Sequence, residues 1–246
     1  MIGRLKRLIL GSHFERLARY LYIRLDPSLW SEYDRLTLDV MHRCLLPSSN
    51  CIDIGAHRGT ILAEIVRVAP KGIHYAFEPV PEHSHYLMHA FSHVRVYEIA
   101  LSNVREKTTF LHDLQHPTRS SFRRRVGTKR KETVIQVQTD LLDNVLPAGW
   151  KVDFIKLDVE GAELAVMQGG VNTLKEQRPV MVFECTLVAL ECFGVTPKEI
   201  YKFLTHDCKM RISLLQDWLA RKGASSGAAF EREVTEGRSL YFVAHE

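Results

Sequence analysis

The chain has 246 residues, of which 46% are hydrophobic and 25% are charged, and its formal net charge is +4. These values are ordinary for a globular protein of one large domain with modest additions. A chain of this length buries about three quarters of its unfolded surface, so its stability requires neither disulfides nor a structural metal. The five cysteines are scattered and form no CxxC pair. Cys51, Cys185 and Cys192 sit among apolar residues, which predicts small buried side chains in a reducing compartment, and we expect a cytoplasmic protein.

The first 46 residues predict a helical extension ahead of a main domain at 47–246. Residues 1–25 are basic and lack the uninterrupted apolar run of a signal peptide or a membrane span. Their apolar residues recur at roughly helical spacing: Leu5, Leu8, Ile9, Leu17 and Leu21. Such a helix could make peripheral contact with a membrane surface. Because Gly11 interrupts the pattern, we favour a helix that packs on the domain or on a second subunit of a homo-oligomer.

From residue 50 onward, apolar strands and helical patterns alternate along the chain. Strands are predicted at 50–55, 72–80, 94–103, 152–161 and 179–185, and helices at 59–69, 81–94, 140–146, 162–177 and 196–207. Strands rich in Ile, Val and Phe that are each followed by a helix are typical of a parallel sheet covered on both faces. The pattern therefore predicts a doubly wound α/β domain.

Two further strand pairs depart from this alternation. Residues 104–138 read as an inserted β-hairpin that flanks a basic, serine-containing loop. Segments 209–215 and 239–246 are strand candidates around a polar, glycine-containing loop, and they could form an antiparallel pair at an edge of the sheet.

Acidic residues lie at the carboxyl ends of four of the predicted strands. Asp53 ends the first strand, Glu78 the second, and Glu184 the fifth, while Asp158 and Glu160 end the fourth. The carboxyl ends of parallel strands meet at one edge, where ligands bind in such folds. A buried carboxylate costs several kcal/mol unless it is satisfied. The repetition therefore predicts a cationic or hydroxyl-rich ligand.

The turn after the first strand favours a nucleoside without a pyrophosphate. Gly55 and Gly59 permit a tight turn and close approach, but the pattern is not GxGxxG. Glu78 follows Asp53 by 25 residues, where an acid could accept hydrogen bonds from both ribose hydroxyls. S-adenosylmethionine is a nucleoside that carries a positive charge and no phosphate, so it fits these acids. The alternative is that Asp53 and Glu78 only cap helices.

Five sequence blocks carry a resemblance to a known family. They are CIDIGAHRGT, YAFEPVPE, VYEIALSN, DFIKLDVEGAELAVMQGG and RPVMVFEC, which span residues 51–185. With them the chain resembles the FkbM family of S-adenosylmethionine-dependent methyltransferases, of the class I methyltransferase fold. The combination of KLDVEGAE with FEP is quite specific.

The resemblance implies a seven-stranded Rossmann-like sheet with an antiparallel last strand. It also implies which residues contact the cofactor: Asp53, Gly55, Ala56, His57, Gly59, Glu78 and Pro79, with the adenine near Ala100 and Leu101. The family usually has Asn at the position of His57, so this chain departs from the pattern there. A serine pair occupies the insertion in the family, which implies that Ser120 and Ser121 line the acceptor pocket.

The acids after the fourth and fifth strands are candidates for catalysis. Methyl transfer to a hydroxyl needs a general base within hydrogen-bond reach, and Asp158 is our first choice. Glu160 and Glu184 are further candidates, with helix capping and a buried structural partnership as their respective alternatives. We assign no metal, although a divalent ion at Asp158 and Glu184 stays open.

The stretch 119–131 holds seven basic residues and no acidic one, and without them the formal net charge would be −3. Such a run is usually a solvated loop. The alternative is a lid that attracts an anionic acceptor, with Arg119 beside the serines. Phe122 is the one aromatic residue of the stretch, whereas stacking on bases would need several. We therefore expect a small-molecule or carbohydrate acceptor rather than a nucleic acid.

These observations predict a methyltransferase that acts on a hydroxyl of a glycan, a glycolipid or a secondary metabolite. One alternative is methylation of nitrogen or of a carboxylate, which needs less help from a base. Another is a non-catalytic methyltransferase-fold module that binds a partner. A nicotinamide-dependent oxidoreductase is opposed by the missing dinucleotide turn.

Overall fold

The computed structural model of the chain describes residues 31–113, 121–123 and 132–246. The chain forms two compact units, Met1–Leu36 and Thr37–Glu246. Of the first unit, only the residues around the start of helix α3, Glu32–Cys44, are described. Most of the predicted extension at 1–46 therefore lies outside the described residues. The sheets and the candidate site belong to the second unit.

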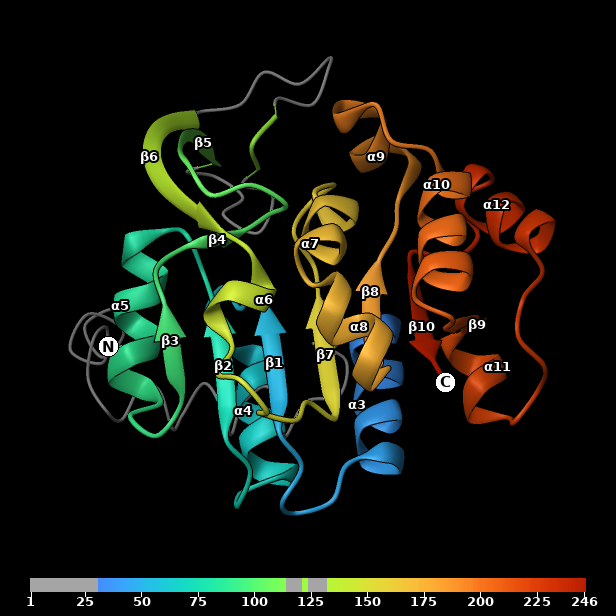
Figure 1. Cartoon of the computed structure of the whole chain (residues 1–246), viewed down its shortest axis with the longest axis horizontal. Coiled ribbons are helices and arrows are strands. Elements are labelled where there is room, and N and C mark those ends of the chain that lie inside the picture. Colours follow the sequence, from blue (N-terminus) through green and yellow to red (C-terminus); the bar gives the residue numbers. More distant parts are fainter. Residues whose placement is uncertain (1–30, 114–120, 124–131) are drawn as a thin grey trace, which may run out of the picture. The chain divides into compact units, whose positions relative to one another are not determined.

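A seven-stranded sheet is the centre of the second unit (Figure 1), with the strand order β3-β2-β1-β7-β8-β10-β9. Strand β10 runs antiparallel to its neighbours β8 and β9, and the other adjacent pairs are parallel. The bounds are β1 Cys51–Ile54, β2 His74–Phe77, β3 Arg95–Tyr97, β7 Phe154–Leu157, β8 Val180–Glu184, β9 Arg211–Leu214 and β10 Tyr241–His245. The predicted doubly wound, mainly parallel sheet with an antiparallel last strand is confirmed.

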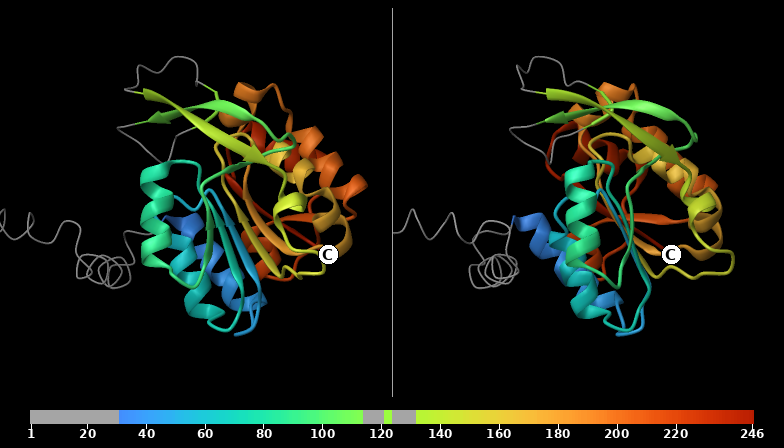
Figure 2. Two further views of the ribbon diagram at one scale, coloured as in Figure 1. Left: turned by 60° about the vertical axis from the view of Figure 1, so that its left-hand side comes forward. Right: turned by 90° about the vertical axis from the view of Figure 1, so that its left-hand side faces the viewer.

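Helices cover both faces of this sheet (Figure 2). Helices α4 and α5 lie on one face, and α6, α7, α8 and α10 lie on the other. Their bounds are α4 Thr60–Val68, α5 Pro81–Ala90, α6 Leu142–Val145, α7 Glu163–Gly169, α8 Val171–Gln177 and α10 Pro197–Lys202. Every residue of β1, β2 and β7 is buried, as expected for strands that are covered on both sides.

Two polar residues face each other inside these apolar strands. Asp53 of β1 and Lys156 of β7 are partners in the parallel register. Both side chains are buried, and burying such groups is costly unless they are paired. The sheet therefore carries a buried Asp–Lys contact directly below its carboxyl edge, in which burial raises the pKa of Asp53 against the lowering effect of Lys156.

A second, three-stranded sheet lies above the carboxyl ends of β1 and β2 (Figure 1). It contains β4 Ala100–Leu101, β6 Glu132–Asp140 and β5 Lys107–Asp113, in the order β4-β6-β5. Strands β5 and β6 are antiparallel, which confirms the predicted pairing of the hairpin. Ser121 adds one bridge to Leu111.

Three predicted elements differ in detail from the structure. The strand predicted at 94–103 is two strands, because the chain leaves the main sheet after β3 and β4 pairs with β6 instead. The helix predicted at 162–177 breaks at Gly170 into α7 and α8. The loop predicted between β9 and β10 contains helices α11, Leu215–Leu219, and α12, Gly227–Thr235. Such short helices give too few turns for a clear periodic pattern.

Other helical segments lie after β8. Helix α9, Leu187–Phe193, was not predicted. Helix α10 starts with the predicted capping box of Thr196 and Glu199 and continues as a π-helix at Phe203–Asp207. No helix within the described ranges is long and apolar enough to cross a membrane. All five cysteines are free thiols; Cys51 and Cys185 are buried as predicted, whereas Cys192 is only partly buried and Cys208 is buried instead.

Candidate active site

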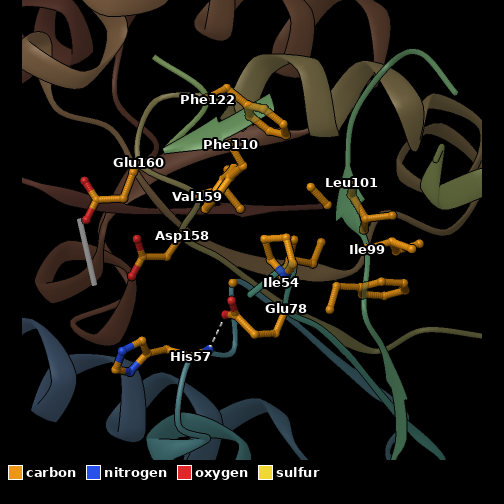
Figure 3. A pocket seen from close by; sticks show the side chains of 14 residues that line it. Ile54, His57, Glu78, Ile99, Leu101, Phe110, Phe122, Asp158, Val159 and Glu160 are labelled. Carbon is orange, nitrogen blue, oxygen red and sulfur yellow. Dashed lines mark hydrogen bonds between the residues drawn. The ribbon is translucent and has the colours of Figure 1, made fainter. Parts of the chain in front are cut away.

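A pocket opens at the carboxyl edge of the main sheet, beneath the three-stranded sheet. Figure 3 shows the carboxylates of Asp158 and Glu160 on one side and the apolar side chains of Ile99 and Leu101 on the other. The lining residues come from β1 and β2, from the segment 99–101, from β5 and its bridge, and from the end of β7: Ile54, Gly55, His57, Phe77, Glu78, Pro79, Ile99, Ala100, Leu101, Phe110, Phe122, Asp158, Val159 and Glu160. The pocket thus has acidic and apolar walls.

The turn after β1 is shaped by its glycines. Gly55 has φ +75°, and a Cβ built there would lie 1.9 Å from the backbone oxygen of Asp158. Gly59 has φ +77°, and its Cβ would lie 2.6 Å from the ring of Phe91. Only glycine fits both the left-handed backbone and the space. Gly55 therefore brings the β1 turn against the end of β7, and Gly59 and Ala56 shape the turn without lining the pocket.

Glu78 lies at the end of β2 with its carboxylate held in place. Its Oε2 accepts the backbone N–H of His57 at 2.8 Å (Figure 3). Its Oε1 accepts the backbone N–H of Val80 at 3.0 Å. A carboxylate oxygen has a second lone-pair site, so each oxygen can still accept another hydrogen bond. Glu78 therefore combines a fixed orientation with acceptor capacity at the pocket wall.

His57 lies opposite Glu78 across the turn and packs against His83, with the ring centroids 4.2 Å apart. Burial, with help from the charge of His83, lowers the pKa of His57 to about 4. The ring is therefore neutral near pH 7. Its Nε2 atom is buried and has no hydrogen-bond partner in the described parts of the chain.

Asp53 does not line this pocket. Its side chain is 1% exposed and faces Lys156, whose Nζ lies 3.4 Å from Oδ1. Of the cofactor residues expected from the sequence, the structure brings Gly55, His57, Glu78, Pro79, Ala100 and Leu101 to the pocket wall. Asp53 is not among the lining residues and pairs with Lys156 instead.

Lys156 is a site residue that the sequence reasoning missed. Its Nζ donates to the backbone oxygen of Gly55 at 2.8 Å and lies 3.7 Å from Oδ2 of Asp158. Burial acts to lower the pKa of Lys156, but the charges of Asp53, Asp158 and Glu78 outweigh it, so the pKa is raised. The residue is therefore a buried ammonium. A single lysine inside the apolar run FIKL was the available signal, because a buried lysine needs an acidic partner.

The three candidate catalytic acids lie together. Asp158, Glu160 and Glu184 each offer one carboxylate oxygen, and these oxygens lie within 4.8 Å of one another. Carboxylates at this spacing could hold a divalent cation between them. Glu160 has φ +58°, a conformation that costs a non-glycine residue about 1 kcal/mol or more. The left-handed backbone of Glu160 changes the direction of the chain in the loop that follows β7.

Two side chains, those of Glu163 and Ser121, fix the loop that carries Asp158 and Glu160. The buried Glu163 accepts the backbone N–H groups of Val159 and Gly161 on Oε1 at 3.1 and 3.2 Å. Burial raises the pKa of Glu163 to about 7, against the lowering effect of these N–H groups. The hydroxyl of Ser121 donates to the backbone oxygen of Glu160 at 3.2 Å. Glu163 therefore acts as a brace inside the protein rather than as a group at the pocket.

The roof of the pocket is aromatic. The rings of Phe110 and Phe122 meet edge to face with centroids 5.1 Å apart. The guanidinium of Arg123 lies 5.7 Å from the ring centroid of Phe193 on α9. The segment 121–123 therefore joins the inserted hairpin to the acidic end of the pocket. Of the predicted acceptor residues, Ser121 lies at this junction, while Arg119 and Ser120 fall outside the described residues.

Known proteins provide independent comparisons. The model of the FkbM methyltransferase domain matches residues 53–212. Among solved structures, methyltransferase FkbM from Methylobacillus flagellatus KT aligns with a TM-score of 0.53 and 13% identity, over 82% of this chain and 44% of that protein. The chain thus spans less than half of that relative, and the likeness shows the shared fold.

Two further solved structures are similar over most of the chain. The O-methyltransferase from Bacillus cereus, in complex with SAH, has a TM-score of 0.47 and 11% identity over 94% of this chain and 88% of that one. The precorrin-6y C5,15-methyltransferase from Geobacter metallireducens GS-15 has a TM-score of 0.44 and 15% identity over 75% and 74%. A search among curated proteins returns no match. The family match covers more than half of the chain, and the chain therefore belongs to the FkbM methyltransferase domain family and is a methyltransferase.

Proposed function

We propose that the protein uses S-adenosylmethionine to methylate a hydroxyl group of a glycan, a glycolipid or a secondary metabolite. The observation that carries the proposal is that Glu78 and Asp158 line one pocket from two different strands. Glu78 presents a fixed acceptor, and Asp158 stands at the acidic side. A nucleoside with a sulfonium needs both features in one cavity.

The lining residues fit this cofactor. Glu78 would accept from the ribose hydroxyls, since both of its oxygens keep acceptor capacity. The apolar side chains of Phe77, Ile99 and Leu101 would pack against the adenine, beside Ala100. Gly55, His57 and Pro79 would complete the wall, while Asp53 would act from behind through Lys156. When bound, the cofactor supplies a methyl group on a sulfonium, and the electron pair of the broken carbon–sulfur bond stays with sulfur.

The chain's own contribution to transfer is the removal of a proton. A hydroxyl is a weak nucleophile near neutral pH and needs a base within hydrogen-bond reach. In this proposal Asp158 takes the proton of the acceptor hydroxyl as the acceptor oxygen forms its bond to the methyl carbon. Glu160 and Glu184 would orient the acceptor, since one carboxylate oxygen of each lies within 4.8 Å of a carboxylate oxygen of Asp158. The roof over the pocket would exclude water, which otherwise competes as an acceptor.

The acceptor in this proposal enters between the inserted hairpin and α9. Ser121 touches the Glu160 loop there, and Arg123 lies over Phe193. A cation at this entrance would favour an anionic acceptor. Methylation of nitrogen or of a carboxylate is the second candidate, and its mark would be activity that survives loss of Asp158.

Calorimetry with S-adenosylmethionine tests the cofactor first. We expect the wild-type protein to give heat, and Glu78→Gln to weaken binding about tenfold or more, the size of a lost charge-assisted hydrogen bond. Glu82→Gln is the matched control, because Glu82 is an exposed residue in the first turn of α5 and, among the described residues, forms an ion pair only with Arg58, at 3.7 Å. No heat from the wild-type protein would refute the cofactor.

A screen with radiolabelled methyl donor then tests the acceptor class. Methyl glycosides, glycolipids and phenolic or polyketide alcohols form one set, and amines and carboxylic acids form the other. Label in the first set that is lost in Asp158→Asn supports transfer to oxygen with a base. Label only in the second set would contradict the proposal.

A further inference from the structure

The carboxylate of Asp158 is approached by two side chains from different strands. The hydroxyl of Tyr241, on β10, donates to its Oδ2 at 2.8 Å. The ammonium of Lys156, on β7, lies 3.7 Å from the same oxygen. No hydrogen bond or ion pair from the described parts of the chain reaches the other oxygen, Oδ1. One face of the carboxylate is therefore engaged by the protein, and the other is left to the pocket.

The two contacts do not follow from packing alone. Strand β8 lies between β7 and β10, so Tyr241 reaches past a whole strand to touch Asp158. Lys156 is buried in β7, which ends one residue before Asp158. A buried ammonium is costly unless acidic or polar partners surround it. The ammonium of Lys156 contacts Asp53, Asp158 and the backbone oxygen of Gly55.

We propose that Lys156 and Tyr241 are positioning residues that hold Asp158 through Oδ2, so that Oδ1 is the oxygen that takes the acceptor's proton. This rests on the proposed function, in which Asp158 is the base. The positive charge of Lys156 keeps the Asp158 carboxylate in place, and the hydrogen bond from Tyr241 fixes the orientation of that carboxylate. Lys156 also ties the Gly55 turn to the same carboxylate, so the cofactor wall and the base share one support.

A spectroscopic experiment tests the proposal without an acceptor. The protein is labelled with [4-¹³C]aspartate, and the Asp158 carboxylate signal is identified by its loss in Asp158→Asn. We expect Tyr241→Phe, which removes only a hydroxyl, to move this signal. Lys156→Met should also move it, and Lys156→Arg should return it toward the wild-type position. Recovery of the signal in Lys156→Arg would show that the positive charge at this position, and not only the packing of the lysine side chain, acts on the Asp158 carboxylate.

The matched control is Tyr201→Phe. Tyr201 lies on α10 and donates to the backbone oxygen of Ser225 at 3.1 Å, so its loss removes a hydroxyl of the same kind elsewhere. We expect the Asp158 signal to stay in place in this variant. An Asp158 signal in Tyr241→Phe that coincides with the wild-type signal overturns the proposal, and this holds even if Lys156→Met does not fold.

Calorimetry with S-adenosylmethionine separates this proposal from the proposed function. Tyr241→Phe should bind the cofactor within about twofold of the wild-type affinity. If the wild-type protein gives no heat, the proposed function fails, while the carboxylate signal still decides whether Tyr241 and Lys156 hold Asp158. If heat is present and the signal does not move, only the positioning role fails.

Discussion

Gly55 packs directly against the backbone of Asp158, since a Cβ on Gly55 would lie 1.9 Å from the Asp158 carbonyl oxygen. The turn after β1 and the backbone of Asp158, the proposed base, are therefore in van der Waals contact. A change in either position moves the other.

Gly55→Ala should therefore disrupt the site and the fold together. The left-handed backbone alone costs about 1 to 2 kcal/mol, and the clash adds about 1 to 3 kcal/mol. Urea denaturation measures the loss of unfolding free energy, and calorimetry measures the loss of cofactor binding. Gly149→Ala is the control, because Gly149 has a similar φ of +74° but no atom within 4 Å of the added Cβ. Equal losses in both variants would contradict the close contact.

Asp158→Asn should lower methyl transfer about 100-fold or more, which is the usual contribution of general base catalysis. Cofactor affinity should stay within about threefold, because Glu78 and the apolar walls are unchanged. The measurement is turnover of the acceptor that the labelled-methyl screen returns, together with calorimetry. Asp217→Asn, on α11 where Asp217 pairs with Lys222 at 2.9 Å, should leave both quantities unchanged. Full turnover in Asp158→Asn would remove this residue as the base.

Glu163→Gln should change how stability depends on pH. The pKa of Glu163 is raised from 4.5 to about 7 by burial, so between these values the folded state keeps a proton that the unfolded state releases. The wild-type protein is therefore most stable below pH 4.5 in this respect, and it loses roughly 3 kcal/mol as the pH rises to about 7. Gln cannot ionise, so the variant should lack this decline.

The free energy of unfolding of wild-type protein and Glu163→Gln, measured by urea at several pH values, tests this. The difference between them should move in favour of the variant from pH 5 to pH 8. Glu176→Gln, at an exposed position of α8, serves as the control. Parallel curves for all three proteins would show that Glu163 does not hold a proton near neutral pH.

His57→Asn should make the fold less sensitive to acid. The pKa of His57 is lowered from 6.5 to about 4 by burial, so between these values only the unfolded state is protonated there. Its contribution to stability is present above pH 6.5 and is lost as the pH falls toward 4. Thermal unfolding from pH 7 to pH 4 should therefore show a smaller decline in the variant. The exposed His93→Asn should decline like the wild-type protein.

The sequence predicted those parts of the site that follow from strand ends. Glu78 and Asp158 could be placed together because parallel strands bring their carboxyl ends to one edge. Gly55 could be recognised because only glycine permits such a turn. The position of Asp53 in the strand could be predicted as well, but not its buried partner Lys156.

The missing parts depend on contacts between distant segments. Asp53 meets Lys156 only because the β1–β7 register pairs them, and a sequence does not specify register. Tyr241 is 83 residues from Asp158 and reaches it across β8. The bridge of Ser121 to Leu111 likewise depends on how the hairpin folds back. Residue types and spacings do not report such pairings.

The inserted segment that runs from β4 to the end of β6 starts and finishes at neighbouring positions, because Ala100 pairs with Thr139 and Leu101 with Asp140. An excursion whose two ends are neighbours can lengthen, shorten or be exchanged without shifting the strands beneath it. The inserted hairpin can thus vary without a change in the strands that position Gly55, Glu78 and Asp158. A different hairpin can therefore be grafted at these two ends while the main sheet and its acidic edge are kept.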